Sequence, residues 1–422
     1  MMKRTVPRLL LTCVLAAALL TLLYYTEQRW GFILIHYESR HDGFHISMAE
    51  RDASQQYKKH LFAVTARDWT SLSTRTVCLA TQASLDHLHW LVNITNSWDG
   101  PVSAAIFTPD VEFQFTKTYV HYLRTCFPAV LKQVSFHFVY PVKRPPRLSP
   151  ADDANRTIVN CAKQYKQYLK ELLSQRPEKM MKSWREKLEY PQNILRNTAR
   201  NTCPSEFIMC PDVDMFVTWS KLETQLKVFL EEPEQQACVK CAYVVPVYEV
   251  NVSVPSPPPN KTALLELVRN GSARPFHMAV FRPNQGLSKL GVWERQPELA
   301  VMKVSHTVKK YDFWYEPMFI APREVPPFDE RFVGFGNTRN SQVYEMYLAG
   351  WTFKVLNNAF LVHWGFQFLK QRPPWRSTQA KKNGLRLRGF IREMAVKYDK
   401  DPINMLSRYP VPNAKFELRR RQ

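Results

Sequence analysis

Short apolar runs of strand length alternate with longer segments of helical periodicity from about residue 76 onwards. The runs expected to form buried strands are residues 76–80, 102–107, 134–140, 206–210 and 242–247. The segments expected to form helices are residues 117–126, 157–186, 193–202 and 221–230. Alternation of this kind is typical of the α/β class, in which helices cover both faces of a sheet. The sequence therefore predicts a mostly parallel central sheet.

An uncharged apolar run at the N-terminus, residues 9–25, follows Lys3, Arg4 and Arg8. At ~1.5 Å per residue a helix of this length spans about 25 Å, enough to cross a thin bilayer. Positive charge before the run predicts a cytoplasmic tail of residues 1–8 and a lumenal body. A cleaved signal peptide ending near Ala16–Ala18 is the alternative. In either case the rest of the chain is expected to be translocated.

The remaining composition agrees with a lumenal protein. Five Asn-x-Ser/Thr sequons are candidate N-glycosylation sites, at Asn93, Asn155, Asn251, Asn260 and Asn270. The net charge of +21 suits anionic partners, which include nucleic acids, membranes, nucleotide sugars and acidic glycans. The chain carries no nucleic-acid-binding motif, and an anchored, glycosylated chain is not expected to bind nucleic acid.

Of the 8 cysteines, Cys13 lies in the apolar run and the others follow it. An oxidising lumen predicts one to three disulfides among these others, and their odd number leaves at least one thiol unpaired. Cys238 and Cys241 form a single CxxC motif without a partner pair. A local disulfide or two free thiols are expected there rather than a zinc site.

Composition also divides the chain into segments. Residues 26–75 are polar and of mixed charge, which predicts a stem, and residues 76–370 are expected to form one catalytic domain. The Pro-rich segment 254–259 reads as a surface loop. Residues 371–422 form a basic C-terminal extension, expected to be a solvated helical face and a frayed end.

Asp212 and Asp214 stand directly after the expected strand 206–210. Alternate side chains of an extended segment point the same way, so two carboxylates would converge at the edge where open α/β sheets bind ligands. Carboxylate oxygens suit Mg²⁺ or Mn²⁺ carrying a diphosphate. A polar turn without chemistry is the alternative.

Several strings outside this motif resemble glycosyltransferase family 49, whose members include glucuronyltransferases of the O-mannosyl glycan pathway. The most specific are FDERFVGFGNTRNSQ (328–342), AGWTFKVL (349–356) and FLVHWGF (360–366). Weaker ones are LATQAS (79–84), YPQNILRNTAR (190–200) and DVDM (212–215). The resemblance runs from about Thr76 to Phe366.

The resemblance implies a GT-A fold, inversion at the anomeric carbon and a Mn²⁺ cofactor, with Mg²⁺ as a substitute. It further implies a single-pass type II Golgi enzyme that transfers glucuronic acid from UDP-glucuronate to an O-mannosyl-type or xylose-containing glycan. Another donor such as UDP-N-acetylglucosamine, or a lumenal glycan-binding protein without activity, are the alternatives. A homodimer or a complex with other glycosyltransferases is a possible assembly.

The resemblance also assigns residues. It places the metal ligands at Asp212, Asp214 and His363, and donor contacts at Thr81, Ala83 and Val213. Helix spacing brings Arg196, Asn197 and Arg200 to positions where they could meet the donor, or else form surface ion pairs. Loops that resemble the acceptor region contain Trp293, Trp314, Glu316 and Asn337.

Inversion requires a general base on the acceptor hydroxyl. The first candidate is Asp329, followed by Glu330 and then Glu345. The alternative for the first two is an ion pair with Arg331, or a contact with acceptor hydroxyls without proton transfer.

Overall fold

Three strands that are almost wholly buried form the centre of the main sheet. They are β3 (Val77–Ser84), β4 (Val102–Phe107) and β5 (Val134–Pro141), and they run parallel. Every residue of β4 and β5 is buried. Strands covered on both faces read as continuous apolar runs, which is why the sequence locates these three correctly.

The sheet continues on both sides of this centre, in the order β1-β2-β5-β4-β3-β6-β12-β8-β13-β11. The prediction of a mostly parallel sheet is wrong, because β2 runs antiparallel to β5 and β12 runs antiparallel to both β6 and β8. A right-handed crossover through a helix makes neighbouring strands parallel. Strand β12 instead returns after the long excursion that contains β9, β10 and β11, so no such crossover sets its direction.

A second sheet has the strand order β10-β9-β14-β7. The expected strand 242–247 is divided between the two sheets, as β8 (Cys241–Val245) and β9 (Val247–Val250). Pro246 separates them. Proline has no N–H to donate to a ladder, so the strand breaks there and the chain crosses to the second sheet.

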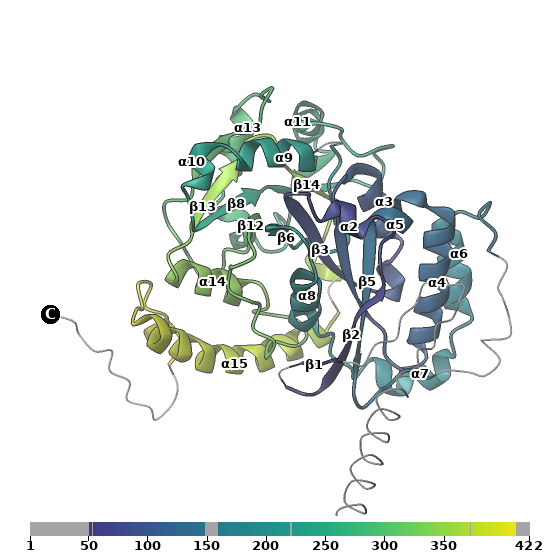
Figure 1. Cartoon of the computed structure of the whole chain (residues 1–422). Helices are drawn as coiled ribbons and strands as arrows, with labels where there is room; N and C mark the ends of the chain where they lie inside the picture. Colours follow the sequence, from purple (N-terminus) through teal and green to yellow (C-terminus); the bar gives the residue numbers. More distant parts are fainter. Residues whose placement is uncertain (1–49, 53, 148–158, 220–221, 372, 411–422) are drawn as a thin grey trace, which may run out of the picture. The chain divides into compact units, whose positions relative to one another are not determined.

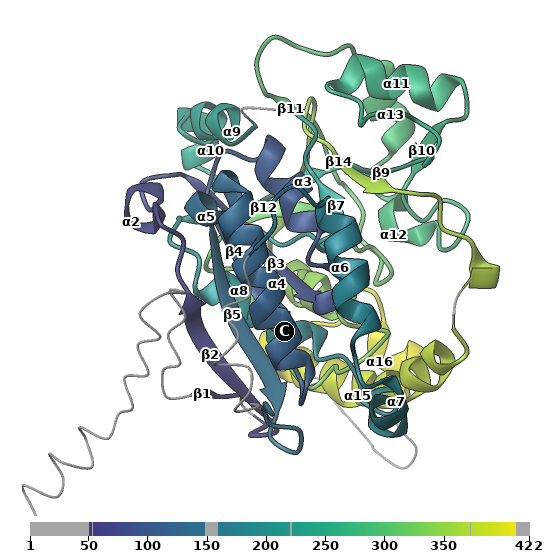
Figure 2. The ribbon, with the colours of Figure 1, turned by 90° about the vertical axis from the view of Figure 1, so that its right-hand side faces the viewer.

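Helices cover both faces of the strands β3 to β5 (Figures 1 and 2). Helix α8 (Gln192–Asn201) lies on one face, and α3 (Trp90–Ser97), α4 (Glu112–Cys126) and α5 (Pro128–Gln133) lie on the other. The single helix expected at 157–186 is two helices, because Pro177 interrupts the pattern.

The computed structural model describes residues 50–52, 54–147, 159–219, 222–371 and 373–410. The remaining strands are β1 (Glu50–Arg51), β2 (Tyr57–Val64), β6 (Phe207–Met209), β7 (Met215–Phe216), β10 (Ala273–Pro275), β11 (Val304–Thr307), β12 (Met318–Pro322), β13 (Thr352–Leu356) and β14 (Leu361–Trp364). The remaining helices are α2 (Trp69–Leu72), α6 (Tyr165–Ser174), α7 (Glu178–Arg185), α9 (Leu222–Leu230), α10 (Pro233–Gln236), α11 (Lys261–Arg269), α12 (Pro283–Gly286), α13 (Leu290–Arg295), α14 (Asn340–Leu348), α15 (Trp375–Tyr398) and α16 (Met405–Arg408), with short 3-10 turns at Leu85–His87 and Leu369–Gln371.

Two expected segment boundaries are wrong. The stem does not extend to residue 75, because β2 belongs to the main sheet and pairs with β5. Several β2 side chains are only half-buried, which leaves the strand a weak apolar pattern. The segment after residue 370 is not merely a solvated tail, since α15 buries Leu387, Phe390 and Ile391 against α14.

The expected membrane anchor, residues 9–25, lies outside the described residues. Among those that are described, no helix combines the length and the hydropathy needed to span a bilayer.

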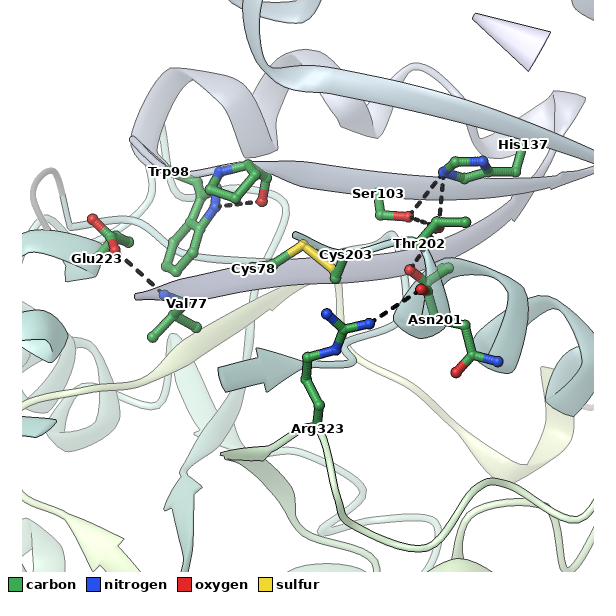
Figure 3. The surroundings of a disulfide bond; sticks show 12 residues. Val77, Cys78, Trp98, Ser103, His137, Asn201, Thr202, Cys203, Glu223 and Arg323 are labelled. Atoms are coloured by element: carbon green, nitrogen blue, oxygen red, sulfur yellow. Dashed lines mark hydrogen bonds between the residues drawn. A yellow bond between two sulfur atoms is a disulfide. The ribbon is translucent and has the colours of Figure 1, made fainter. Parts of the chain in front are cut away.

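Three disulfides join six of the described cysteines, as the sequence predicts for an oxidising compartment. They are Cys78–Cys203, Cys126–Cys161 and Cys238–Cys241, and Cys210 keeps a free thiol. The first bridge joins β3 to the residue after the C-cap of α8 (Figure 3). The start of β3 and the C-terminal end of α8 are therefore covalently linked.

A buried polar cluster lies beside this bridge and centres on His137 of β5 (Figure 3). The His137 Nδ1 atom accepts the backbone N–H of Phe62 at 2.7 Å. Its Nε2 atom lies 3.1 Å from Ser103 Oγ and 3.0 Å from Thr202 Oγ1. Burial lowers the pKa of His137 to about 3, so the neutral ring is the form that the fold requires.

The bridges make a first testable prediction about stability. Replacing both Cys78 and Cys203 by Ser should lower the free energy of unfolding by about 4–5 kcal/mol, because the bridge closes a loop with a sequence separation of 125. The matched control is the double variant of Cys126 and Cys161, whose separation is 35. Loop entropy predicts a loss about 1 kcal/mol smaller for the control. Denaturant unfolding measures both, and equal losses would contradict the entropic explanation.

Candidate active site

The loop with the two aspartates joins β6 to β7 at the edge of the main sheet. Strand β6 ends at Met209, and Asp212 and Asp214 precede Met215. The Thr81 hydroxyl on β3 donates to the carbonyl of Pro211 at 3.1 Å, which holds the loop against the neighbouring strand. Thr81 is nearly fully buried, so its role in the structure is to support the loop.

The carboxylate of Asp212 is held by other side chains of the protein. Its Oδ1 atom accepts from Arg196 Nη2 at 2.9 Å and from Gln82 Nε2 at 3.2 Å, and Arg339 Nη2 lies at 3.5 Å. Burial would raise the pKa of Asp212, but the two guanidinium groups outweigh it and lower the pKa to about 2. Sequence reasoning missed Arg339, which also donates to the carbonyl of Cys210 at 3.0 Å.

Asp214 faces the histidine that the sequence singled out. Its Oδ2 atom lies 3.6 Å from His363 Nε2, and the two strands next to them pair Met215 with His363. The Nδ1–H of His363 donates to the carbonyl of Gly365 at 2.9 Å. Gly365 has a φ of +100°, which only glycine adopts readily, so the turn that places this carbonyl requires it.

This pair fits a divalent cation. When a histidine donates its Nδ1–H to a carbonyl, its Nε2 atom carries the lone pair, and that lone pair points to the opposite side of the ring. Metal-binding histidines have this arrangement. Burial lowers the pKa of His363, but Asp214 outweighs it and the pKa is raised. In the described part of the chain, no three His, Cys, Asp or Glu side chains form a ready-made metal cluster. Asp214 and His363 would therefore share a cation with phosphate and water oxygens.

A buried carboxylate that the sequence analysis missed, Glu249 on β9, supports the histidine. It forms an ion pair with Arg274 at 2.8 Å and accepts the backbone N–H of Gln367 at 3.1 Å. Gln367 Nε2 lies 3.2 Å from His363 Nε2. An acidic residue inside the apolar string VYEV was the signal available in the sequence.

The polar side chains of α8 hold loops. Asn197 exchanges hydrogen bonds with the backbone of Phe328, at 2.8 and 3.0 Å. Arg200 donates to three carbonyls, of Arg323, Val325 and Pro326. These two residues are buried, and their contacts serve the loop after β12 rather than a bound donor. Arg196, through Asp212, is the α8 side chain that reaches the aspartate loop.

The carboxylates predicted as general bases are each paired with a cation. Asp329 binds Arg331 at 2.6 Å, and Arg331 also binds Glu393. Glu330 lies 3.4 Å from Lys59 and accepts from Asn197 at 3.1 Å. Glu345 binds Lys397 at 2.6 Å. The structure brings none of the three into contact with Asp212, Asp214 or His363 in the described residues.

Of the residues expected to contact an acceptor, Trp293 is a core residue. It has an exposed fraction of 0%, its Nε1–H donates to the carbonyl of Leu356, and Lys261 Nζ lies 4.1 Å from its ring centre. A ring with no exposed surface cannot stack on a sugar, so that expectation is wrong. Trp314 is half-buried against Phe313.

The structure also shows where the other expected site residues lie. Ala83 is buried on β3 and Val213 is buried between the two aspartates. Asn337 adopts a φ of +57° in the turn before α14. Glu316 lies partly buried before β12, where Asn284 Nδ2 donates to its Oε2 at 2.8 Å.

The sequons differ in exposure. Asn270 is exposed, and Asn251 and Asn93 are half-buried. Asn260 is the N-cap of α11, where its side chain accepts from the N–H of Ala263 at 2.8 Å. Asn155 lies outside the described residues.

The sequence model of the family described as "Glycosyl-transferase for dystroglycan" matches residues 76–399. The chain belongs to this family. The resemblance to family 49 is thereby confirmed, and the match includes all of α15, which the expected domain boundary at residue 370 left out.

Named relatives agree with a glycosyltransferase. The chain is 30% identical to beta-1,4-glucuronyltransferase 1 of Bos taurus and of Homo sapiens, over 79% of this chain and 78% of each relative. It is 27% identical to the mouse xylosyl- and glucuronyltransferase LARGE2, over 68% of this chain and 34% of that protein. Among solved structures, S. aureus TarS superposes with a TM-score of 0.36 and 10% identity, over 76% of this chain and 39% of TarS.

Proposed function

We propose that this glycosyltransferase transfers glucuronic acid from UDP-glucuronate to a glycan, with inversion at the anomeric carbon and with Mn²⁺ as cofactor. Two findings support this donor: the family match, and relatives that carry the name beta-1,4-glucuronyltransferase. The observation that carries the proposal is the Asp214–His363 pair, with 3.6 Å between Oδ2 and Nε2, next to the sheet-edge loop of Asp212. We assign the fold to the GT-A type.

Each residue of the site has a separate proposed role. Asp214 and His363 would hold the Mn²⁺ ion, and Mg²⁺ could replace it. The bound cation supplies charge that offsets the negative charge of the departing nucleoside diphosphate. Arg196 and Arg339 fix Asp212 and keep its carboxylate ionised. Glu249 and Arg274 hold the segment after His363 through Gln367.

We further propose a lumenal Golgi enzyme with residues 9–25 as a type II anchor. Three disulfides suit an oxidising compartment. The acceptor would be an O-mannosyl-type or xylose-containing glycan. Asn251 and Asn270 are the sequons best suited to carry glycans, because in each the side-chain Oδ1 atom accepts the backbone N–H of the sequon serine in a surface turn. Assembly as a homodimer, or with other glycosyltransferases, belongs to the same proposal.

A donor screen tests the proposal. The purified full-length chain is incubated with Mn²⁺, a β-xyloside acceptor and one of several sugar nucleotides, and UDP release is measured. We expect the highest acceptor-dependent rate with UDP-glucuronate and a loss of that rate when EDTA removes the metal. UDP-glucose is the matched control, since it differs from UDP-glucuronate in lacking the sugar carboxylate.

A higher rate with UDP-N-acetylglucosamine would replace the donor and keep the mechanism. Full activity in EDTA would contradict the metal assignment. A chain that binds glycans and releases no UDP with any donor would be a lumenal binding protein, contrary to the proposal.

A further inference from the structure

Among the residues expected in the acceptor region, Glu316 carries a carboxyl group. Glu316 precedes β12, and no ion pair of the described residues includes it. The carboxylates that the sequence offered as bases, by contrast, all bind Lys or Arg. A carboxylate paired with a cation is a weaker base, because the cation stabilises its ionised form.

One residue, Asn284, fixes the orientation of the Glu316 side chain. Asn284 on α12 contacts it twice: its Nδ2 donates to Glu316 Oε2 at 2.8 Å, and its carbonyl accepts the backbone N–H of Glu316 at 2.8 Å. The hydrogen bonds of the described residues leave Oε1 available. A general base needs this arrangement, with one oxygen fixed and the other able to accept a hydroxyl proton.

The support of Glu316 is continuous with the strand next to the histidine. Gln285, the neighbour of Asn284, exchanges two hydrogen bonds of 2.9 Å with the backbone of Val247 at the start of β9. Strand β9 pairs with β14, and its Glu249 lies opposite His363. The anchor of Glu316 is thus attached to the sheet that carries the metal-binding candidate.

Asp212 and the two arginines that hold it also act on Glu316 electrostatically. Burial raises the pKa of Glu316, the guanidinium groups of Arg339 and Arg196 lower it, and Asp212 raises it, with a raised pKa as the result. Tyr311 is the further titratable group that interacts with it. Glu316 is therefore within electrostatic reach of the Asp212 cluster and is anchored to the His363 sheet.

We propose that Glu316 is the general base that accepts the proton of the acceptor hydroxyl. The inference rests on the proposed inverting transfer. As the acceptor oxygen forms its bond to the anomeric carbon, its proton passes to Glu316 Oε1. The bond from that carbon to the diphosphate oxygen breaks, and its electron pair leaves with UDP. Solvent takes the proton from Glu316 after the products depart.

The test compares full-length wild-type protein with Glu316→Gln, using Mn²⁺, the β-xyloside and the donor that the wild type uses best. We expect kcat to fall by about 100-fold or more, because general bases contribute at least that factor. The KM for both substrates should change less than about threefold, since Gln keeps the shape and can still accept from Asn284. The decline of wild-type kcat towards acid pH should be absent from the variant.

Two further variants complete the experiment. Glu316→Asp keeps the carboxylate but shortens the side chain, and should retain more activity than Glu316→Gln. The control Glu324→Gln removes an exposed carboxylate after β12 and should match the wild type. Calorimetric binding of UDP with Mn²⁺, and thermal melting, should be the same for all of them, which excludes misfolding as the cause.

Two results would overturn the inference: a Glu316→Gln variant within about fivefold of wild-type kcat, or one with a raised acceptor KM and an unchanged kcat. The second result would make Glu316 an acceptor-binding residue only. Failure of the proposed function is distinguishable, because in that case the wild type itself shows no transfer with any donor.

Discussion

Replacing Asp214 by Asn is expected to lower kcat/KM for glycosyl transfer at least ~100-fold while the protein keeps its fold. The amide has nearly the shape of the carboxylate but lacks the negative charge that attracts a divalent cation. Asp214 is about one-third exposed and makes no buried ion pair with Lys or Arg in the described residues, so its replacement should cost little stability. His363→Ala is expected to have a similar effect on transfer.

The measurements are initial rates at several Mn²⁺ concentrations, together with Mn²⁺ binding in the presence of UDP. A raised Mn²⁺ requirement in both variants would agree with a shared cation. The control is Asp68→Asn, which neutralises an exposed aspartate whose ion pair is with the adjacent Arg67. Ordinary rates in both Asp214→Asn and His363→Ala, with an unchanged Mn²⁺ dependence, would show that this pair does not bind the metal.

The second large effect concerns stability as a function of pH. His137 has a folded-state pKa of about 3, below the ordinary value of 6.5, so the unfolded chain binds a proton that the folded one excludes. Its contribution to stability is complete above pH 6.5 and is lost as the pH falls from there towards 3. At ~1.4 kcal/mol per pH unit, the loss between pH 7.5 and 4.5 should be about 3 kcal/mol.

The variant His137→Gln isolates this contribution. It should be less stable than the wild type at pH 7.5, because the hydrogen bonds to Phe62, Ser103 and Thr202 are disturbed. Its stability should fall less steeply below pH 6.5, since glutamine does not titrate. The exposed His87→Gln is the control and should follow the wild type. The free energy of unfolding is measured by denaturant titration at each pH. Equal decreases of this free energy with falling pH in the wild type and in His137→Gln would contradict the explanation.

The sequence located the central strands and the aspartate loop because local patterns determine them. Buried parallel strands are apolar runs, and two carboxylates after such a run are visible without a structure. The histidine followed from the resemblance of the string FLVHWGF to the family, since a single His in an apolar strand is otherwise ambiguous.

What the sequence could not provide were the partners of polar groups. Arg339 reaches Asp212 across more than one hundred residues, and no local pattern connects them. Asp329 is an attractive base until Arg331 is seen to bind both of its carboxylate oxygens. Strand β2 was missed for a different reason, because half-buried positions weaken its apolar pattern.

Helix α8 has a consequence for producing the protein. One end of the helix is tied to β3 by Cys78–Cys203, and its other residues hold Asp212 and the loop after β12. Synthesis in a reducing cytosol would leave this helix without its covalent anchor. Enzyme made there should lose turnover before it loses its secondary structure, and secretion from a eukaryotic host is the appropriate route to active material.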